Sequence, residues 1–213
     1  MDETRLHDGS LYRTIDPELG KVQMAYLDKL YEFNQLRPSQ IAERTAKLQE
    51  MFAELGEHCY IESPLHADWG GKFVHFGKHI YANFGLTLVD DTHIYVGDNV
   101  QFGPNVVLAT AGHPVAPELR PLSYQYNAPI HIGENCWLGA GVIVLPGITI
   151  GANSVIGAGA VVTKDVPANV VAVGNPCHVL RSVNAHDQEY YFKKQRIDWA
   201  QVEAESGLTK PEG

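Results

Sequence analysis

Aliphatic residues return at every sixth position through much of the C-terminal half of the chain. The residues that carry this period are Ile132, Leu138, Val144, Ile150, Ile156 and Val162. In most of these repeats the next residue is small, as at Gly133 and Gly139. A helix repeats every 3.6 residues and a half-buried strand every two, so neither explains a period of six. The period predicts a mainly β protein built as a parallel β-helix, in which each hexad supplies one strand and one corner and three hexads close a coil.

Residues 17–55 show a helical pattern, with apolar side chains three and four residues apart. The two series are Leu19, Val22, Tyr26, Leu30 and Phe33, followed by Ile41, Thr45, Leu48, Phe52 and Leu55. Asp16 suits an N-cap, Pro17 suits a first helical turn, and Gly56 suits a helix end. We therefore expect two helices, joined near residues 35–38, that cover one end of the β-helix.

The six-residue period breaks between about residues 109 and 129. This segment contains Gly112 and prolines at positions 114, 117, 121 and 129. Proline removes a backbone donor and fixes φ, so the segment does not suit a regular coil. We expect a loop that leaves the solenoid, and loops on rigid scaffolds often carry functional residues.

The chain thus divides into three predicted parts. They are an N-terminal helical segment (1–57), a β-helix (58–182) with the excursion loop 109–129, and a C-terminal helix and tail (183–213). Residues 183–196, which include Tyr190, Tyr191 and Phe192, are expected to form a helix that caps the open end of the solenoid. The polar stretch after them is expected to be mobile.

Composition excludes several classes of protein. The 213 residues are 45% hydrophobic and 19% charged, which fits a packed domain. The net charge of −9 argues against a nucleic-acid-binding surface. Three widely spaced cysteines predict no disulfide framework and hence a cytoplasmic protein. A polar start predicts no signal peptide, and no run approaches the roughly 18 apolar residues of a membrane span.

Several ordered motifs together resemble the maltose/galactoside O-acetyltransferase family. They are Tyr81-Ala82-Asn83-Phe84, Val89-Asp90-Asp91, Ala111-Gly112-His113-Pro114-Val115, Ile132-Gly133-Glu134-Asn135-Cys136-Trp137-Leu138-Gly139 and Gly157-Ala158-Gly159-Ala160-Val161-Val162-Thr163-Lys164-Asp165-Val166-Pro167. The resemblance extends over residues 9–194. It implies a left-handed β-helix, a homotrimer with active sites between subunits, and acetyl transfer from acetyl-CoA to a sugar hydroxyl, with no metal required.

His113 is the candidate catalytic residue. It lies in the excursion loop between Gly112 and Pro114. A hydroxyl that attacks a thioester must lose its proton, and an imidazole has a pKa suited to accepting that proton near neutral pH. The family's catalytic histidine matches this position, and the resemblance implies direct attack in a ternary complex without an acyl-enzyme.

The candidate ligands divide between acceptor and donor. On the acceptor side the resemblance implies Asn83 and Asp91, with Tyr81, Asp16 and Asp68 as further ligands; amides and carboxylates suit sugar hydroxyls. On the donor side it implies Trp137 near the thioester, Ala140 and Ala158 along the pantetheine, and Thr163, Lys164 and Arg181 toward the phosphates.

Alternatives remain open at this stage. Gly85 stands where relatives often carry Asn or Asp, so a non-sugar acceptor such as serine or an antibiotic is one alternative. A metal enzyme similar to γ-class carbonic anhydrases is another, because histidines 66, 75, 79, 93 and 131 lie in the coils. A solenoid that serves only as an interaction scaffold is the third, since fold alone does not fix function.

Overall fold

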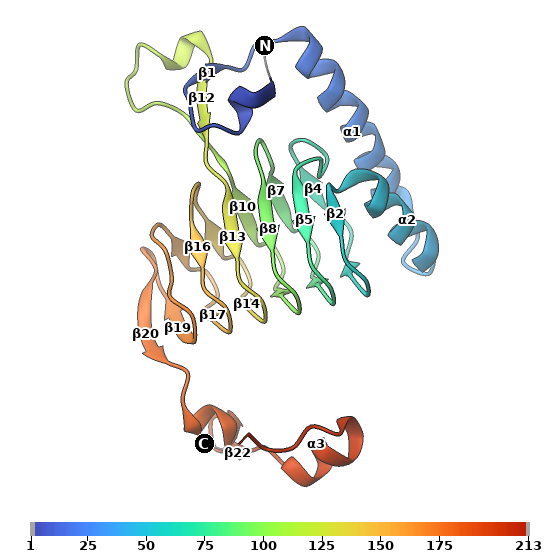
Figure 1. The fold of residues 1–213 in the computed structure, drawn as a ribbon, viewed down its shortest axis with the longest axis vertical. Helices are drawn as coiled ribbons and strands as arrows, with labels where there is room; N and C mark the ends of the chain where they lie inside the picture. The colour runs from blue at the N-terminus through green and yellow to red at the C-terminus, as the bar shows by residue number, and fades with distance from the viewer. Residues whose placement is uncertain (1–2, 212–213) are drawn as a thin grey trace.

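Short parallel strands stacked into three sheets form the centre of the molecule (Figure 1). The computed structural model describes residues 3–211. One sheet contains β2 (Glu54–Leu55), β5 (Val74–Phe76), β8 (Ile94–Val96), β13 (Ile130–Ile132) and β16 (Thr149–Ile150). A second contains β4 (His66–Ala67), β7 (Thr87–Val89), β10 (Val107–Ala109), β15 (Ile143–Val144) and β18 (Val161–Val162). The third contains β3 (Tyr60–Ile61), β6 (Tyr81–Ala82), β9 (Gln101–Phe102), β14 (Trp137–Leu138), β17 (Val155–Ile156), β19 (Val170–Val173) and β20 (His178–Ser182).

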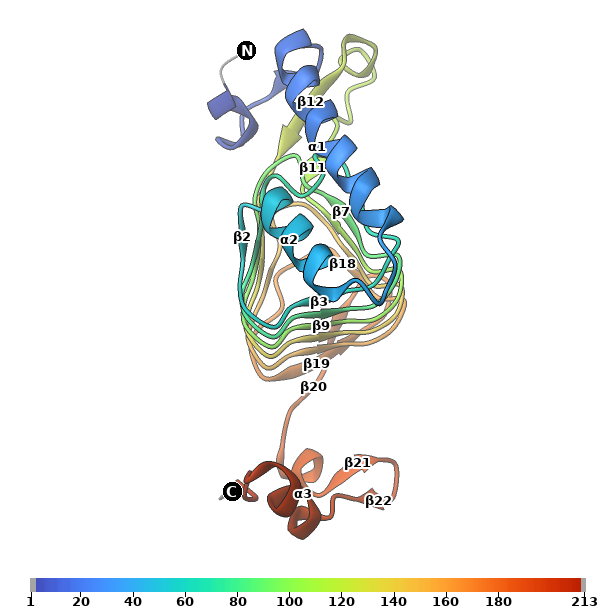
Figure 2. The same ribbon diagram turned by 90° about the vertical axis from the view of Figure 1, so that its right-hand side faces the viewer.

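The chain visits the three sheets in turn, so each circuit makes one coil with three sides (Figure 2). Each strand pairs in register with the strand one coil away. Leu138, for example, pairs with Phe102 on one side and Ile156 on the other. The β-helix predicted from the six-residue period is therefore confirmed.

Two features recur at the corners between sheets. One residue lies in close contact with the backbone of the next coil, and a residue nearby has a left-handed backbone conformation. At the corner after β8, a Cβ on Gly97 would lie 2.6 Å from the backbone nitrogen of Glu134 in the next coil. Two residues later Asn99 has φ of +59°, a conformation that asparagine tolerates better than most residues. Gly56 occupies the same kind of corner, with its Cβ position 2.4 Å from the Gly77 carbonyl oxygen. The prediction that Gly56 ends a helix is therefore wrong.

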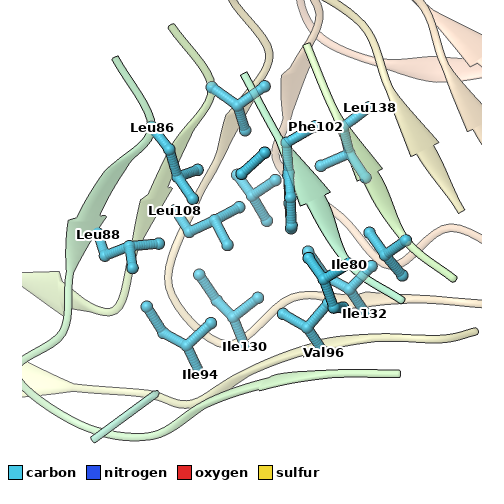
Figure 3. Packing of buried hydrophobic residues seen from close by; sticks show 14 of the residues in the cluster. Ile80, Leu86, Leu88, Ile94, Val96, Phe102, Leu108, Ile130, Ile132 and Leu138 are labelled. Atoms are coloured by element: carbon cyan, nitrogen blue, oxygen red, sulfur yellow. The ribbon is translucent and has the colours of Figure 1, made fainter. Parts of the chain in front are cut away.

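The interior is a continuous column of aliphatic and aromatic side chains (Figure 3). Residues that carry the hexad period point inward because side chains alternate along each short strand. Leu138, Val144, Ile150, Ile156 and Val162 have no exposed surface. Cys136 is buried as well, as expected for a small apolar residue at its position.

Two helices cover the first coil. Helix α1 (Pro17–Gln35) and helix α2 (Ile41–Met51) place Phe33, Leu48 and Met51 in the same apolar cluster as the coils. The helical pattern overestimates the second helix, because Glu54–Leu55 already forms β2. No helix within residues 3–211 has the length and apolarity needed to cross a membrane.

The excursion is an ordered ribbon. Strand β11 (Ala111–Gly112) and strand β12 (Tyr124–Asn127) pair antiparallel, and β12 also pairs with β1 (Tyr12–Arg13) near the N-terminus. Two 3₁₀ turns, Glu3–Leu6 and Arg120–Leu122, flank this small sheet. It projects from the side of the solenoid and stands above the coils in the view of Figure 1.

The C-terminal part differs from its prediction. Residues 183–196 form a 3₁₀ turn (Ala185–Gln188) and a hairpin of β21 (Tyr190–Phe192) and β22 (Gln195–Arg196) instead of a helix. The C-terminal helix is α3 (Trp199–Ser206), within the stretch expected to be mobile; residues 212–213 of that stretch lie outside the described residues. Strand β20, antiparallel to β19, extends the last coil, and the hairpin and α3 stand away from it (Figure 1).

Candidate active site

A groove of about 470 Å³ lies on the third sheet, across β6, β9, β14 and β17. Its lining includes Tyr81, Asn83, Trp137, Ala140 and Ala158, all singled out from the sequence. Tyr81 and Trp137 point outward because Ala82 and Leu138, which follow them, are buried. Trp137 is 55% exposed, so a large apolar surface stands open along the groove.

The two alanines lie at equivalent corners of two adjacent coils, after β14 and after β17. Each follows a corner glycine, and a Cβ on Gly139 would lie 2.7 Å from the nitrogen of Ala158. The Ala140 carbonyl accepts a hydrogen bond from the Gly159 amide at 2.8 Å. Both alanines are exposed, and their small side chains leave the corner backbone open to a ligand.

Asn83 lies in the groove directly after β6, and two hydrogen bonds hold it in place. Its backbone nitrogen donates to the Phe102 carbonyl at 3.0 Å, and its Oδ1 accepts from the Phe84 nitrogen at 2.8 Å. Gly85, at the end of the same corner, has φ of +74°, and a Cβ there would lie 2.3 Å from Oδ1 of Asn105. The left-handed backbone of this corner suits glycine, and it suits asparagine as well.

A second cavity, of about 190 Å³, lies between α1, the turn after β4 and the excursion. Asp68 and Asp91 line it together with Tyr12, Trp69 and Gln125. Asp91 is 6% exposed; its Oδ1 accepts a hydrogen bond from Gln125 Nε2 at 2.7 Å. Its Oδ2 is buried and has no hydrogen-bond partner of ordinary geometry among the described residues, while the side chains of Asp68 and Trp69 lie close enough to the carboxyl to affect its pKa. Burial and the neighbouring Asp68 charge raise the pKa of Asp91 to about 6.

Asp90, next to it, has a structural task. Its two carboxylate oxygens accept hydrogen bonds from the backbone nitrogens of Trp69 (2.7 Å) and Gly71 (2.9 Å). Burial raises the pKa of Asp90 to about 7. These bonds hold the turn that carries Asp68, while Gln23 of α1 donates to the Asp68 carbonyl at 2.9 Å.

His113 follows β11 on the excursion and is exposed. Its Nδ1 lies 2.9 Å from the carbonyl oxygen of Tyr124 on β12. A carbonyl only accepts hydrogen bonds, so the contact requires a proton on Nδ1. The neutral imidazole then carries its lone pair on Nε2, which is the arrangement a general base needs.

The residues expected at the phosphate end are separated. Thr163 and Lys164 line a cavity of about 740 Å³ at the last coil, together with Pro176 and His178. Arg181 is outside that lining and holds Asp187 through two bonds of 2.7 Å. The guanidinium hydrogen bond lowers the pKa of the Asp187 carboxyl, as expected for a bidentate pair.

Asp16 caps helix α1. Its Oδ1 accepts from the backbone nitrogens of Glu18 (2.9 Å) and Leu19 (3.3 Å). It belongs to the lining of neither the groove nor the cavity around Asp91. The cap that the sequence offered as an alternative is thus the role visible in the fold.

Histidines 75, 79, 93 and 131 each stack on or lie against another histidine or a tyrosine ring. Nε2 of His75 lies 2.9 Å from Nδ1 of His93, and the His131 ring stacks on Tyr95 at 4.8 Å. Within residues 3–211, no three His, Cys, Asp or Glu side chains are arranged to hold a metal ion.

Sequence reasoning missed Tyr12, Trp69 and Gln125 in the lining around Asp91. A signal was available in strand β12, where Gln125 and Asn127 alternate with two tyrosines. Polar residues on the buried side of a strand require hydrogen-bond partners. Within one chain, the predicted residues form four groups: the groove, the cavity at Asp91, the excursion with His113, and the cavity at the last coil with Thr163 and Lys164. Asp16 and Arg181 lie outside these groups.

Comparison with known proteins adds family matches to this geometry. Residues 5–56 match the maltose acetyltransferase hexapeptide capping motif, and residues 129–164 match the bacterial transferase hexapeptide family (six repeats). A galactoside O-acetyltransferase of Lactococcus lactis is 54% identical over 194 residues, which is 91% of this chain and 94% of the relative.

Solved structures agree with the sequence relatives. A galactoside acetyltransferase in complex with coenzyme A superimposes with a TM-score of 0.89 at 45% identity, covering 93% of this chain and 99% of that one. A maltose O-acetyltransferase from Clostridium difficile gives 0.84 at 38% identity, covering 86% and 98%.

Proposed function

The chain belongs to the hexapeptide-repeat sugar O-acetyltransferases, and from that membership we propose that it transfers acetyl from acetyl-CoA to a sugar hydroxyl, with His113 as general base. The observation that carries the proposal is the 2.9 Å contact between His113 Nδ1 and the Tyr124 carbonyl. That contact supports a basic Nε2 on an exposed part of the excursion.

The proposed reaction is a direct transfer. His113 Nε2 takes the proton of the acceptor hydroxyl as its oxygen attacks the thioester carbonyl carbon. The tetrahedral intermediate collapses with cleavage of the C–S bond, and the coenzyme A thiolate takes up the proton from the imidazolium. The products are an acetyl ester and free coenzyme A, and the enzyme returns to its starting state.

The groove on the third sheet is the proposed donor site. Trp137 offers an apolar face near the thioester, and the corner backbone at Ala140 and Ala158 suits the amides of pantetheine. Thr163 and Lys164 lie at the last coil, where an ammonium group suits a phosphate. Arg181 already holds Asp187 through two hydrogen bonds, whereas Lys164 lines the cavity at the last coil, so Lys164 is the favoured cation.

The proposed acceptor ligands are Asn83, Tyr81, Asp91 and Asp68, with Asp16 as a further prediction. Asp91 supports this role best, because its buried Oδ2 is an acceptor without a donor of ordinary hydrogen-bond geometry among the described residues. His113, Asn83 and Asp91 belong to different groups within one chain. A homotrimer that assembles each site from neighbouring subunits would bring them together.

Cytoplasmic activity is part of the proposal. Cys59, Cys136 and Cys177 are all free thiols, which suits a reducing compartment. Burial raises the pKa of the Cys136 and Cys177 thiols, which favours packing over reactivity.

An acceptor survey tests the proposal. Purified protein is given acetyl-CoA and, separately, galactosides, maltose, serine and hydroxylated antibiotics, while thiol release and acetylated product are measured. We expect thiol release and an O-acetyl ester with at least one sugar. Transfer only to serine or to an antibiotic would replace the sugar assignment, and transfer to no acceptor would contradict the proposed activity.

A further inference from the structure

Four buried polar side chains join the excursion to the solenoid and to the N-terminal segment. Tyr12, Asp91, Gln125 and Asn127 are all at most 6% exposed. Gln125 Nε2 lies 2.7 Å from the Tyr12 hydroxyl, 2.7 Å from Asp91 Oδ1 and 3.0 Å from Asn127 Oδ1. Asn127 Nδ2 in turn donates to the Tyr12 hydroxyl at 2.9 Å and to the Asp91 carbonyl at 3.2 Å.

The strands explain why these groups meet. Strands β1 and β12 lie side by side (Figure 1). Tyr12 pairs directly with Gln125, so the two side chains share one face of the small sheet. Gln125 and Asn127 are both buried because they alternate with Tyr124 and Tyr126 along the strand. Asp91 follows β7, one coil before the strand β10 after which the excursion departs.

The two carboxylate oxygens of Asp91 have different surroundings. Oδ1 is held by Gln125, whereas Oδ2 is buried and has no hydrogen-bond partner of ordinary geometry among the described residues. A buried acceptor without a donor carries a desolvation cost, which a ligand hydroxyl would remove. By occupying Oδ1, the Gln125 amide leaves Oδ2 as the carboxylate oxygen that can accept a further hydrogen bond.

We propose that Gln125, supported by Tyr12, is a positioning residue that fixes Asp91 so that Oδ2 receives a hydroxyl of the acceptor. This inference rests on the proposed function, in which Asp91 binds the acceptor. Gln125 acts through Asp91, and its role is to set acceptor affinity.

The charges around Asp91 predict a pH signature. Asp68, Asp90 and Tyr12 are the titratable groups that face it. Burial and Asp68 raise the pKa of Asp91, while the side chains of Gln125 and, to a lesser extent, Trp69 lower it. Removal of the amide donor leaves the carboxylate less stabilised, so Asp91 becomes protonated at higher pH.

The test compares Gln125→Met, which keeps the length of the side chain and removes the donor, with Gln125→Glu, which adds a second carboxylate. We expect Gln125→Met to raise the KM for the sugar about tenfold, as for loss of a charge-assisted hydrogen bond. The kcat and the KM for acetyl-CoA stay near wild type. The acidic limb of kcat/KM for the sugar moves to higher pH, and further still in Gln125→Glu.

Two further variants keep the test decisive. Gln49→Met makes the same change at an exposed position of α2 and is expected to behave as wild type. Tyr12→Phe keeps the ring and removes one partner of the amide, so it is expected to raise the sugar KM less than Gln125→Met does. It also serves if Gln125→Met fails to fold.

The outcomes separate this inference from the proposed function. An inactive wild type contradicts the proposed function. An active wild type with an unchanged sugar KM and acidic limb in folded Gln125→Met, or in Tyr12→Phe where that variant replaces it, overturns the inference alone. A loss confined to kcat overturns it too, because such a loss would assign the network to positioning His113.

Discussion

Trp137 and Leu138 are neighbours in β14 with opposite surroundings. Trp137 is 55% exposed along the groove, whereas Leu138 is fully buried in the column. An exposed aromatic face contributes to ligand binding with little effect on folding. A change at Trp137 therefore tests donor binding, and a change at Leu138 tests stability.

Replacement of Trp137 by Ala is expected to raise the KM for acetyl-CoA about five- to tenfold, which corresponds to about 1 kcal/mol of lost contact. Its melting temperature should stay close to wild type. The matched Leu138→Ala variant should lose about 2–5 kcal/mol of unfolding free energy because it opens a cavity. Steady-state kinetics and thermal unfolding measure both. An unchanged acetyl-CoA KM in Trp137→Ala would place the donor elsewhere.

His93 gives a pH-dependent term in stability. Burial, followed by the nearby His7, His75 and Lys72 charges, lowers the pKa of His93 to about 4. The unfolded chain takes up this proton near pH 6.5 and the folded chain only near pH 4. The contribution of His93 to the free energy of unfolding is therefore fully present above pH 6.5 and is lost as pH falls toward 4.

Chemical unfolding of wild type and His93→Gln between pH 7.5 and pH 4 checks this term. The free energy of unfolding of wild type should fall relative to that of the variant as pH decreases, because the glutamine does not titrate. A difference between the two proteins that stays constant across this range would show that His93 keeps its ordinary pKa in the fold.

Single residues were predicted unevenly from the sequence. Trp137 and Asn83 were predicted from the family resemblance, and the fold places both on one groove, where their roles stay predictions. Arg181 was assigned to a phosphate because sequence does not reveal that Asp187, six residues on, binds the guanidinium. Gln125 was missed because its partners Tyr12 and Asp91 are 113 and 34 residues away.

At the scale of elements, the corners limit which residues the solenoid accepts. A Cβ at Gly97 would meet the Glu134 backbone at 2.6 Å, whereas a Cβ at Gly20 in α1 has nothing within 4 Å. Both positions are glycine, so substitution by alanine is expected to lower stability at Gly97 and to raise it at Gly20. The corner belongs to rigid stacked coils, and backbone cannot move aside as a flexible side chain can.

Gly97→Ala is expected to destabilise the protein by about 1–3 kcal/mol, as overpacking does. Gly20→Ala is expected to stabilise it by about 1 kcal/mol, since alanine is the better helix former. Denaturant unfolding of the two variants beside wild type measures both signs. Equal effects of the two substitutions would contradict the close stacking at the corners.

Elements with a long periodic signal were predicted well, and short ones were not. The hexads repeat many times, so register and inward positions follow from the pattern. The hairpin Tyr190–Phe192 with Gln195–Arg196 offers only a few residues, and its strands are mostly exposed, so no buried face marks its period. Residues 54–55 fit the helical spacing by chance, and pairing with β5 decides their conformation.

At the scale of the whole molecule, the residues of the proposed active site lie in separate parts of the described chain. The groove with Asn83 and the excursion with His113 are separate features of one copy. A closed homotrimer would repeat one contact three times and so complete three equivalent sites. Composition gives no sign of this arrangement, because net charge and residue counts describe one chain.

Complementation between inactive subunits tests the shared site. Asn83→Ala and His113→Ala proteins are mixed, unfolded and refolded together. If each site takes Asn83 from one subunit and His113 from its neighbour, about a quarter of the sites regain both residues by random mixing. Acetyl transfer should then rise well above that of either parent. Activity no higher than the parents', in trimers confirmed by light scattering, would place both residues in one subunit's site.

The most direct measurement of the central claim is the rate of acetyl transfer to a sugar by His113→Ala at saturating acetyl-CoA. His113 is exposed, so the variant should fold as wild type does. We expect kcat to fall by about 10²–10⁴, the usual contribution of a general base, with little change in the KM for acetyl-CoA. A variant that keeps wild-type kcat would contradict the assignment of His113 as the base.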